Sequence, residues 1–314
     1  MTGRRRHSKF LAIALILLVS LAIGVWIFFP RPKNPTGRET YILVSDPMIV
    51  ASWNGADRTL TILTFPSDIA AEGTRGYGMY SLAAFWRLGE IEKKDGTVLS
   101  ESMSEALGIP VTGYIGPKTA LFDFRDTAFV TVKATFSMKN VFRFLGGRFR
   151  TNIPFNKFIG LAWMLNFSRP DRTNTYDFTH TIESIVQDSV LPDGSTIRIL
   201  DPQRVDSQVK NIFEAESVRR ESVTVAVYNT TAMPSLGNRV GRLLANLGVS
   251  VVTVGNDTPE VETCTVSGST ATLKSKTADV IVAVLGCKPV VGETTRADLI
   301  IRIGSSYAKR FLPN

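Results

Sequence analysis

The sequence predicts an α/β or α+β protein carried on one N-terminal transmembrane helix. Three observations lead to this fold class. Residues 10–29 form an uncharged apolar run, residues 40–220 mix strand-like with helix-like apolar patterns, and residues 221–314 alternate strands with helices. Alternating apolar residues indicate strands, whereas apolar residues three or four positions apart indicate helices. The apolar content of 44% is that of an ordinary globular protein, so the body can bury a core.

The apolar run is long enough to cross a bilayer. It holds 20 positions from Phe10 to Phe29 without a charge, and a helix rises about 1.5 Å per residue against a hydrocarbon core of about 30 Å. A cleaved signal peptide is the alternative, but its apolar region is shorter and ends at small residues, whereas this run ends in bulky ones. We therefore expect a retained anchor between a tail at 1–9 and a Pro-rich linker at 30–39.

The charges beside the run favour one orientation. Arg4, Arg5, Arg6 and Lys9 precede it, and basic residues favour the cytoplasmic side. We expect a single-pass plasma-membrane protein with its N-terminus in the cytoplasm and its body outside. The net charge of +8 suits a membrane surface or an anionic envelope polymer, or it serves solubility alone. An exported body does not meet nucleic acid.

Two cysteines and two histidines limit the metal chemistry. No Cys-x-x-Cys pair exists, and His stands only at positions 7 and 180, which excludes a Cys/His zinc site. In an oxidising compartment Cys264 and Cys287 can form a disulfide, which in the chain-entropy model stabilises a fold by about 3 kcal/mol. Two buried thiols are the alternative. No cofactor is expected from this composition.

The region 40–220 begins with a predicted hairpin. Apolar runs over 48–53 and 59–65 flank a turn that contains Asn54 and Gly55. Asp201 is expected to cap a helix over 204–216 by accepting hydrogen bonds from its first amides. The other expected elements are helices over 79–94, 99–107, 137–145 and 154–166, and strands over 111–115, 127–134 and 195–200.

The region 221–314 has the clearest pattern. Val223, Val225 and Val227 alternate as in a strand, and an apolar stripe from Leu236 predicts a helix that Gly248 ends. The remaining expected elements are strands over 249–254, 261–267 and 297–303 and a helix over 272–285. The order β-α-β-β-α-β predicts a ferredoxin-like domain with two helices on one face of a four-stranded antiparallel sheet.

Several stretches of this last region resemble the LytR C-terminal domain. The stretches are Val-Thr-Val-Ala-Val-Tyr-Asn-Thr-Thr at 223–231, Leu-Gly-Asn-Arg-Val at 236–240, Leu-Ala-Asn-Leu-Gly at 244–248 and Ala-Asp-Leu-Ile-Ile-Arg-Ile-Gly at 297–304. The resemblance covers about 90 residues. It implies a protein of the cell envelope.

The preceding region resembles a reduced LytR-CpsA-Psr catalytic domain. Val-Ser-Asp-Pro at 44–47 is similar to the R-S-D-T of that family, Phe-Pro-Ser-Asp at 65–68 to its I-P-R-D, and the stretch 105–115 to its segment ending in L-G-I-P-I-D-Y-Y. The resemblance implies a mixed-sheet domain over 40–220 on the outer side of the membrane. Enzymes of the family transfer a phosphorylated glycopolymer from a polyprenyl carrier to peptidoglycan with a divalent metal.

The resemblance implies that Asp46 and Asp68 match the acids of the family, whereas Val44 and Ser67 replace its arginines. Arginines hold pyrophosphate oxygens, and their loss removes transition-state stabilisation. We therefore expect a non-catalytic factor that binds envelope polymer, a polyprenyl-linked glycan or another envelope protein. The alternative is an active phosphotransferase in which Asp46 and Asp68 hold Mg²⁺. Their other interpretation is as turn and loop residues beside prolines.

Arginines elsewhere supply the remaining candidates. Arg75 lies in a Gly-rich loop and Arg87 follows it, and both are candidates to replace the missing arginines. The stretch 142–150 interleaves Arg143, Arg148 and Arg150 with phenylalanines, a pattern typical of contact with lipid headgroups or an anionic carrier. An amphipathic helix with buried Phe and solvated Arg is the alternative. His180 near Asp177 lacks a nucleophile and is not pursued as a catalytic base.

The predicted topology has a direct test. Protease added to intact cells should digest the body, because the apolar run presents it outside the cytoplasm. A body that is cut only after lysis would contradict this. Free thiols at Cys264 and Cys287 that label only from the cytosol would instead favour a cytosolic, membrane-tethered regulator.

Overall fold

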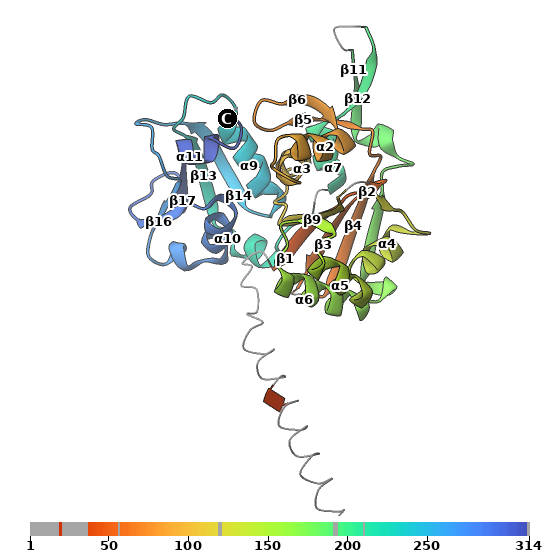
Figure 1. The fold of residues 1–314 in the computed structure, drawn as a ribbon. Coiled ribbons are helices and arrows are strands. Elements are labelled where there is room, and N and C mark those ends of the chain that lie inside the picture. Colours follow the sequence, from red (N-terminus) through yellow and green to blue (C-terminus); the bar gives the residue numbers. More distant parts are fainter. Residues whose placement is uncertain are drawn as a thin grey trace, which may run out of the picture. The chain divides into compact units, whose positions relative to one another are not determined.

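A computed structural model describes residues 19–20, 37–55, 57–118, 121–190, 194–209 and 211–312 (Figure 1). The chain divides into two compact units, residues 1–33 and 34–314. The predicted span 10–29 lies outside the described residues except for Val19 and Ser20, which are helical. Within the described part of the chain, no helix combines the length and the apolar character needed to cross a membrane.

A six-stranded mixed sheet organises the region that follows the linker. Its strand order is β10-β4-β3-β1-β7-β9, with β1 parallel to β7 and antiparallel to β3. The predicted hairpin is confirmed as β3 and β4, which pair antiparallel. The strands are β1 (Arg38–Leu43), β3 (Met48–Asn54), β4 (Thr59–Phe65), β7 (Gly113–Pro117), β9 (Phe149–Thr151) and β10 (Thr173–Asp177).

Helices cover both faces of this sheet and make two cores. Ile42 and Val44 belong to a core that includes residues of helices α2 and α3. Tyr41 and Leu43 belong to a second core that includes residues of helices α4, α5 and α6. Successive residues of a strand point to opposite faces, so β1 supplies both cores. The helices are α2 (Leu82–Ile91), α3 (Thr97–Leu107), α4 (Ala128–Thr135), α5 (Met138–Leu145) and α6 (Phe155–Asn166).

The expected strand over 127–134 is wrong, because this segment forms α4. The Thr127 side chain accepts a hydrogen bond from the Val130 amide and caps the helix. The buried residues Ala128, Thr131, Val132 and Thr135 follow helical spacing. The alternation of Val130 and Val132 that indicated a strand is therefore a coincidence of apolar residues on two sides of a helix.

Smaller elements complete the region before residue 222. Asp201 caps α7 as predicted, since its carboxylate accepts hydrogen bonds from the Gln203 and Arg204 amides. Gly108 ends α3 in the left-handed conformation, as the sequence predicts. A four-stranded sheet has the order β11-β12-β5-β6, and a two-stranded sheet joins β2 to β8. These elements are β2 (Ser45–Asp46), β5 (Ala70–Gly73), β6 (Gly78–Ser81), β8 (Phe122–Asp123), η1 (Pro170–Arg172), η2 (Ile182–Ser184), β11 (Val186–Val190), β12 (Thr196–Leu200), α7 (Pro202–Val209) and α8 (Glu216–Glu221).

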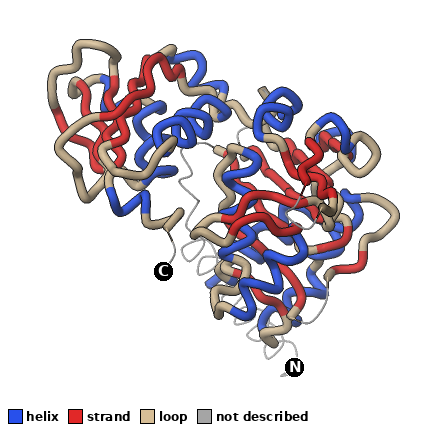
Figure 2. The backbone as a smooth tube through the Cα atoms, turned by 90° about the horizontal axis from the view of Figure 1, so that it is seen from above, coloured by secondary structure: helices blue, strands red, loops and turns tan. Residues whose placement is uncertain are grey.

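The C-terminal region forms a five-stranded sheet rather than the predicted four-stranded antiparallel one. Its order is β14-β13-β17-β15-β16, and only β15 and β17 pair antiparallel. Helices after β13 and β15 return the chain to the neighbouring strand, which makes the pairs parallel. Figure 2 shows these strands together with helices beside them. The elements are β13 (Thr224–Asn229), α9 (Leu236–Asn246), β14 (Ser250–Asn256), β15 (Thr265–Gly268), η3 (Thr272–Lys274), α10 (Lys276–Leu285), β16 (Lys288–Val291), β17 (Leu299–Ile303) and α11 (Ser305–Ala308).

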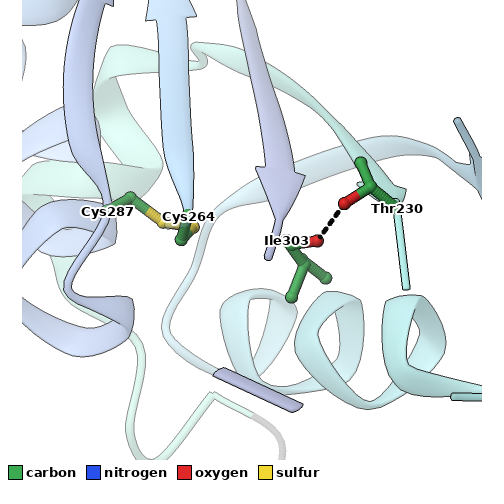
Figure 3. The surroundings of a disulfide bond; sticks show 4 residues. All are labelled: Thr230, Cys264, Cys287 and Ile303. Carbon is green, nitrogen blue, oxygen red and sulfur yellow. Dashed lines mark hydrogen bonds between the residues drawn. A yellow bond between two sulfur atoms is a disulfide. The ribbon is translucent and has the colours of Figure 1, made fainter. Parts of the chain in front are cut away.

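A disulfide joins Cys264 to Cys287 in this domain (Figure 3). The two residues precede the parallel strands β15 and β16, so the bond links the beginnings of an adjacent pair. Both cysteines are buried in the C-terminal core. Nearby, the Thr230 hydroxyl donates to the Ile303 carbonyl over 2.8 Å at the end of β17.

The C-terminal domain contacts the preceding region through Arg242 of α9. Its guanidinium binds both carboxylate oxygens of Asp206, at 2.7 and 2.8 Å. It also donates to the carbonyls of Glu105 and Ala106 at the end of α3. Bidentate pairs and hydrogen bonds to a charged group are among the stronger polar interactions. Arg242 therefore anchors the domain to α3 and α7.

Replacing Arg242 should destabilise the fold. Arg242→Ala removes charge-assisted hydrogen bonds and leaves Asp206 without this partner, so we expect a loss of roughly 2–3 kcal/mol in the free energy of unfolding. Arg220→Ala is the matched control, because Arg220 forms an exposed pair with Glu216 one helical turn away, typically worth about 0.3–0.5 kcal/mol. Chemical denaturation measures both; equal losses would contradict this role for Arg242.

Glu105 makes the same contact sensitive to pH. Burial raises the pKa of Glu105 above its ordinary value of 4.5, although Arg239 and Arg242 nearby act to lower it. The Arg239 Nη1 lies 3.3 Å from the carboxylate. Between the ordinary and the raised pKa, the folded chain therefore binds more protons than the unfolded chain.

The stability contribution of Glu105 should consequently decrease as the pH rises through that window. Glu105→Gln should remove this component of the slope of unfolding free energy against pH. Denaturation of both proteins across a pH series tests the effect, with Glu216→Gln as an exposed control. An unchanged slope in Glu105→Gln would show that burial does not perturb this group.

Candidate functional site

A small cationic pocket lies where α2, β9 and the segment after β7 meet. Its volume is about 90 Å³. Arg87 and Glu90 come from α2, Lys118 and Leu121 follow β7, and Arg150 comes from β9. Three cationic side chains therefore surround one carboxylate, which favours an anionic ligand.

Arg150 has the most unusual environment in this pocket. Its side chain is only 9% exposed, and its guanidinium carbon lies 3.9 Å from the centre of the Trp86 ring. Nη1 is 3.5 Å from a carboxylate oxygen of Glu90, yet among the described residues neither Nε nor Nη1 has a hydrogen-bond partner. Buried donors without partners carry a free-energy cost. Arg150 also lines the pocket, so its guanidinium contributes positive charge there.

An apolar floor holds Trp86 in position. Trp86 packs edge to face against Tyr114, with ring centres 5.9 Å apart. A Cβ at Gly116 would lie 2.5 Å from the Trp86 ring and 2.9 Å from the Cβ of Val44, so only glycine fits there. Val44 itself is fully buried. Val44, at the position that resembles a family arginine, thus belongs to the same apolar core as Trp86.

Asp46 is connected to the pocket by a short series of contacts. The Ser67 hydroxyl donates to its carboxylate over 2.8 Å, and the Ala83 amide donates to the Ser67 carbonyl over 3.0 Å. Ala83 belongs to the pocket lining. Ser45 and Asp46 also pair with Phe122 and Asp123, which follow Leu121.

Asp68 has a different partner from Asp46. Its carboxylate forms a 3.9 Å ion pair with Arg198 of β12 and is largely exposed. Among the described residues, no three His, Cys, Asp or Glu side chains gather where they could hold a metal ion. The assignment of Asp46 and Asp68 to Mg²⁺ therefore stays a prediction.

The structure separates the arginines that the sequence groups together. Arg75 forms a bidentate pair with Glu101, with both distances at 2.8 Å, and this hydrogen bonding raises its pKa. Arg143 and Arg148 are exposed, in α5 and just after it. Only Arg150 of the predicted binding residues lies in the cationic pocket, together with Arg87.

His180 and Asp177 lie at the surface near β10. The His180 Nε2 is 3.8 Å from the Asp177 carboxylate, and the imidazole is exposed. Burial acts to raise the pKa of Asp177, but hydrogen bonds from Thr179 and Thr64 outweigh it and leave that pKa below its ordinary value. Asp177 therefore serves to hold a turn rather than to activate a base.

Sequence reasoning missed Trp86, Glu90 and Lys118. No local pattern marks them, because the pocket depends on the antiparallel pairing of β7 with β9. That pairing sets Gly116 opposite Arg150 and carries the arginine toward α2. Such a juxtaposition follows from strand order and register, which one sequence does not reveal.

Comparison with known proteins identifies the C-terminal domain. Residues 222–307 match the family model described as LytR cell envelope-related transcriptional attenuator. This region is a LytR C-terminal domain, so the resemblance found in its sequence is confirmed. No curated protein is similar enough in sequence to match the chain.

Solved structures of LytR-CpsA-Psr proteins are similar to this chain, with low sequence identities and low TM-scores. YvhJ from Bacillus subtilis has 12% identity and a TM-score of 0.37, over 54% of this chain and 92% of YvhJ. TagT bound to LI-WTA has 13% identity and a TM-score of 0.38, over 57% of this chain and 90% of TagT. YwtF from Bacillus subtilis has 12% identity and a TM-score of 0.39, over 70% of this chain and 94% of YwtF.

Proposed function

We propose that this chain is a membrane-anchored envelope protein that binds a phosphate-bearing polymer in the pocket of Arg87, Lys118 and Arg150. The LytR C-terminal domain supports a role in the cell envelope. Anchoring through residues 10–29, a cytoplasmic N-terminus and a body outside the membrane belong to the same proposal. The observation that carries it is the buried Arg150, which stacks on Trp86 and lines the pocket together with Arg87 and Lys118.

The geometry suits recognition of a phosphodiester. Arg150 is preorganised by stacking on Trp86, so little side-chain entropy is lost when an oxyanion binds. A guanidinium can donate two parallel hydrogen bonds to one phosphate. Arg87 and Lys118 add positive charge at the same cavity, which Glu90 offsets only in part.

Binding without transfer is favoured by what surrounds the pocket. Val44 is buried in the floor and Ser67 is committed to Asp46, so the two positions that resemble family arginines bear no cation. Catalysis requires interactions that strengthen in the transition state. We therefore propose that the pocket retains the polymer for assembly and does not cleave its phosphate ester.

Substitution of Arg150 tests the proposed binding. We expect Arg150→Ala to weaken the affinity for a synthetic glycerol-phosphate oligomer by about 10- to 100-fold, because charge-assisted hydrogen bonds are lost. Arg150→Lys should recover part of the affinity, since it keeps the charge but not the paired donors. Isothermal titration calorimetry provides the measurement.

Arg148→Ala is the matched control, because Arg148 is exposed and lies two residues away. Its affinity should remain close to that of the unmodified chain. Equal affinities for Arg150→Ala and Arg148→Ala would contradict the proposed site.

An active phosphotransferase remains the second candidate, and one observation favours it. Asp46 is linked through Ser67 to Ala83, which lines the pocket, so a carboxylate is connected to the site. Turnover of a lipid-pyrophosphate glycan that requires Mg²⁺ and disappears in Asp46→Ala would establish this function and overturn the binding-only proposal.

A further inference from the structure

The chain enters its folded body beside the β3–β4 turn. Gly37, the first described residue of the body, accepts a hydrogen bond through its carbonyl from the Gly55 amide over 2.6 Å. Gly37 lies eight positions after Phe29, where the apolar run ends, with only seven residues between them. An extended chain spans at most about 3.6 Å per residue, so this connection has a maximum reach of about 30 Å.

A large open cavity occupies the same end. Its volume is about 730 Å³, and Gly55 belongs to its lining. Trp163 and Phe167 line it from the end of α6, and both side chains are 64% exposed. Their rings lie 5.0 Å apart. Large aromatic residues exposed in pairs are unusual on a surface that meets only water.

Cationic side chains surround these aromatic rings. Arg58, Arg169 and Arg172 all line the cavity. Asp57 and Asp171 are their chain neighbours, but neither belongs to the cavity lining. The cavity face is therefore aromatic and positively charged. We call Arg58, Trp163, Phe167, Arg169 and Arg172 the entry face.

Helix α5, which packs against α6, also exposes large apolar side chains. α5 packs against α6 through Phe144, whose ring lies 4.5 Å from that of Phe158. α5 also presents Met138, Phe142 and Leu145 to solvent. Figure 1 shows α5 and α6 next to each other on one side of the sheet.

We propose that the entry face docks on the anionic phospholipid headgroups of the bilayer. Tryptophan and phenylalanine favour the interfacial region of a membrane, and arginines near an anionic surface each add attraction. The short connection from the apolar run keeps the face within reach of the surface. This surface shares no lining residue with the cationic pocket. Docking would therefore orient the body relative to the bilayer and would not provide a second polymer site.

A fluorescent probe on the full chain tests the docking. Ser168→Cys places a thiol in the cavity lining, and the two native cysteines are occupied by their disulfide. The labelled chain is reconstituted in nanodiscs of phosphatidylcholine with or without phosphatidylglycerol. We expect blue-shifted emission and quenching by spin-labelled lipid in the anionic discs, both reversed by high salt.

Two controls make the result specific. A probe at Val254→Cys, on the exposed side of β14, should respond to neither lipid. The double variant Arg169→Gln/Arg172→Gln should reduce the ratio of docked to undocked chain by about tenfold or more, since each arginine contributes about fivefold. Arg219→Gln/Arg220→Gln removes the same charge from exposed α8 positions and should have no effect.

The experiment distinguishes docking from its absence. Absence of a response at position 168, an equal response in neutral and anionic discs, or equal effects of the two double variants would overturn the docking proposal. Thermal unfolding of each variant identifies a loss of fold, and the salt dependence of the unsubstituted chain gives an independent measure. Affinity for the glycerol-phosphate oligomer reports on the cationic pocket alone, so the two proposals fail separately.

Discussion

The central strand β1 is the constraint on which the rest of the larger region depends. Alternate residues of β1 and its extension supply the two cores on opposite faces of the sheet, so a shift by one residue would place every side chain in the wrong core. The segment after β1 leads directly to Asp46, and β7 beside it leads to Lys118. The register of β1 therefore determines both the packing of the two cores and the placement of the segments that lead to the site.

Stacking of Arg150 on Trp86 links that framework to the cationic pocket. The arginine stacks on the Trp86 ring, and a Cβ at Gly116 would collide with both that ring and Val44. Val44 is fully buried in the same core as Trp86, so a cation at position 44 would place its charge among apolar side chains. The positive charge comes instead from α2, β9 and the segment after β7.

Local features of the fold were predictable from the sequence, whereas features that depend on distant pairing were not. The β3–β4 hairpin, the cap at Asp201 and the end of α3 at Gly108 follow from neighbouring residues. β16 was missed because Pro289 and full exposure leave no alternation to detect. Of the pocket, Arg87 and Arg150 were candidates, but nothing in their spacing indicated that β7–β9 pairing would bring them together.

The length of β1 has a consequence for the reach of the protein. The strand begins at Arg38, next to the point where the chain enters the body, and Asp46 lies three residues beyond its end. Six extended residues measure about 20 Å. The strand therefore separates the entry point from Asp46 and the segment that leads to the pocket by a fixed length, and a change in the sequence before residue 37 leaves this separation unaltered. A chain of several repeating units would span the gap, whereas a single small headgroup would not.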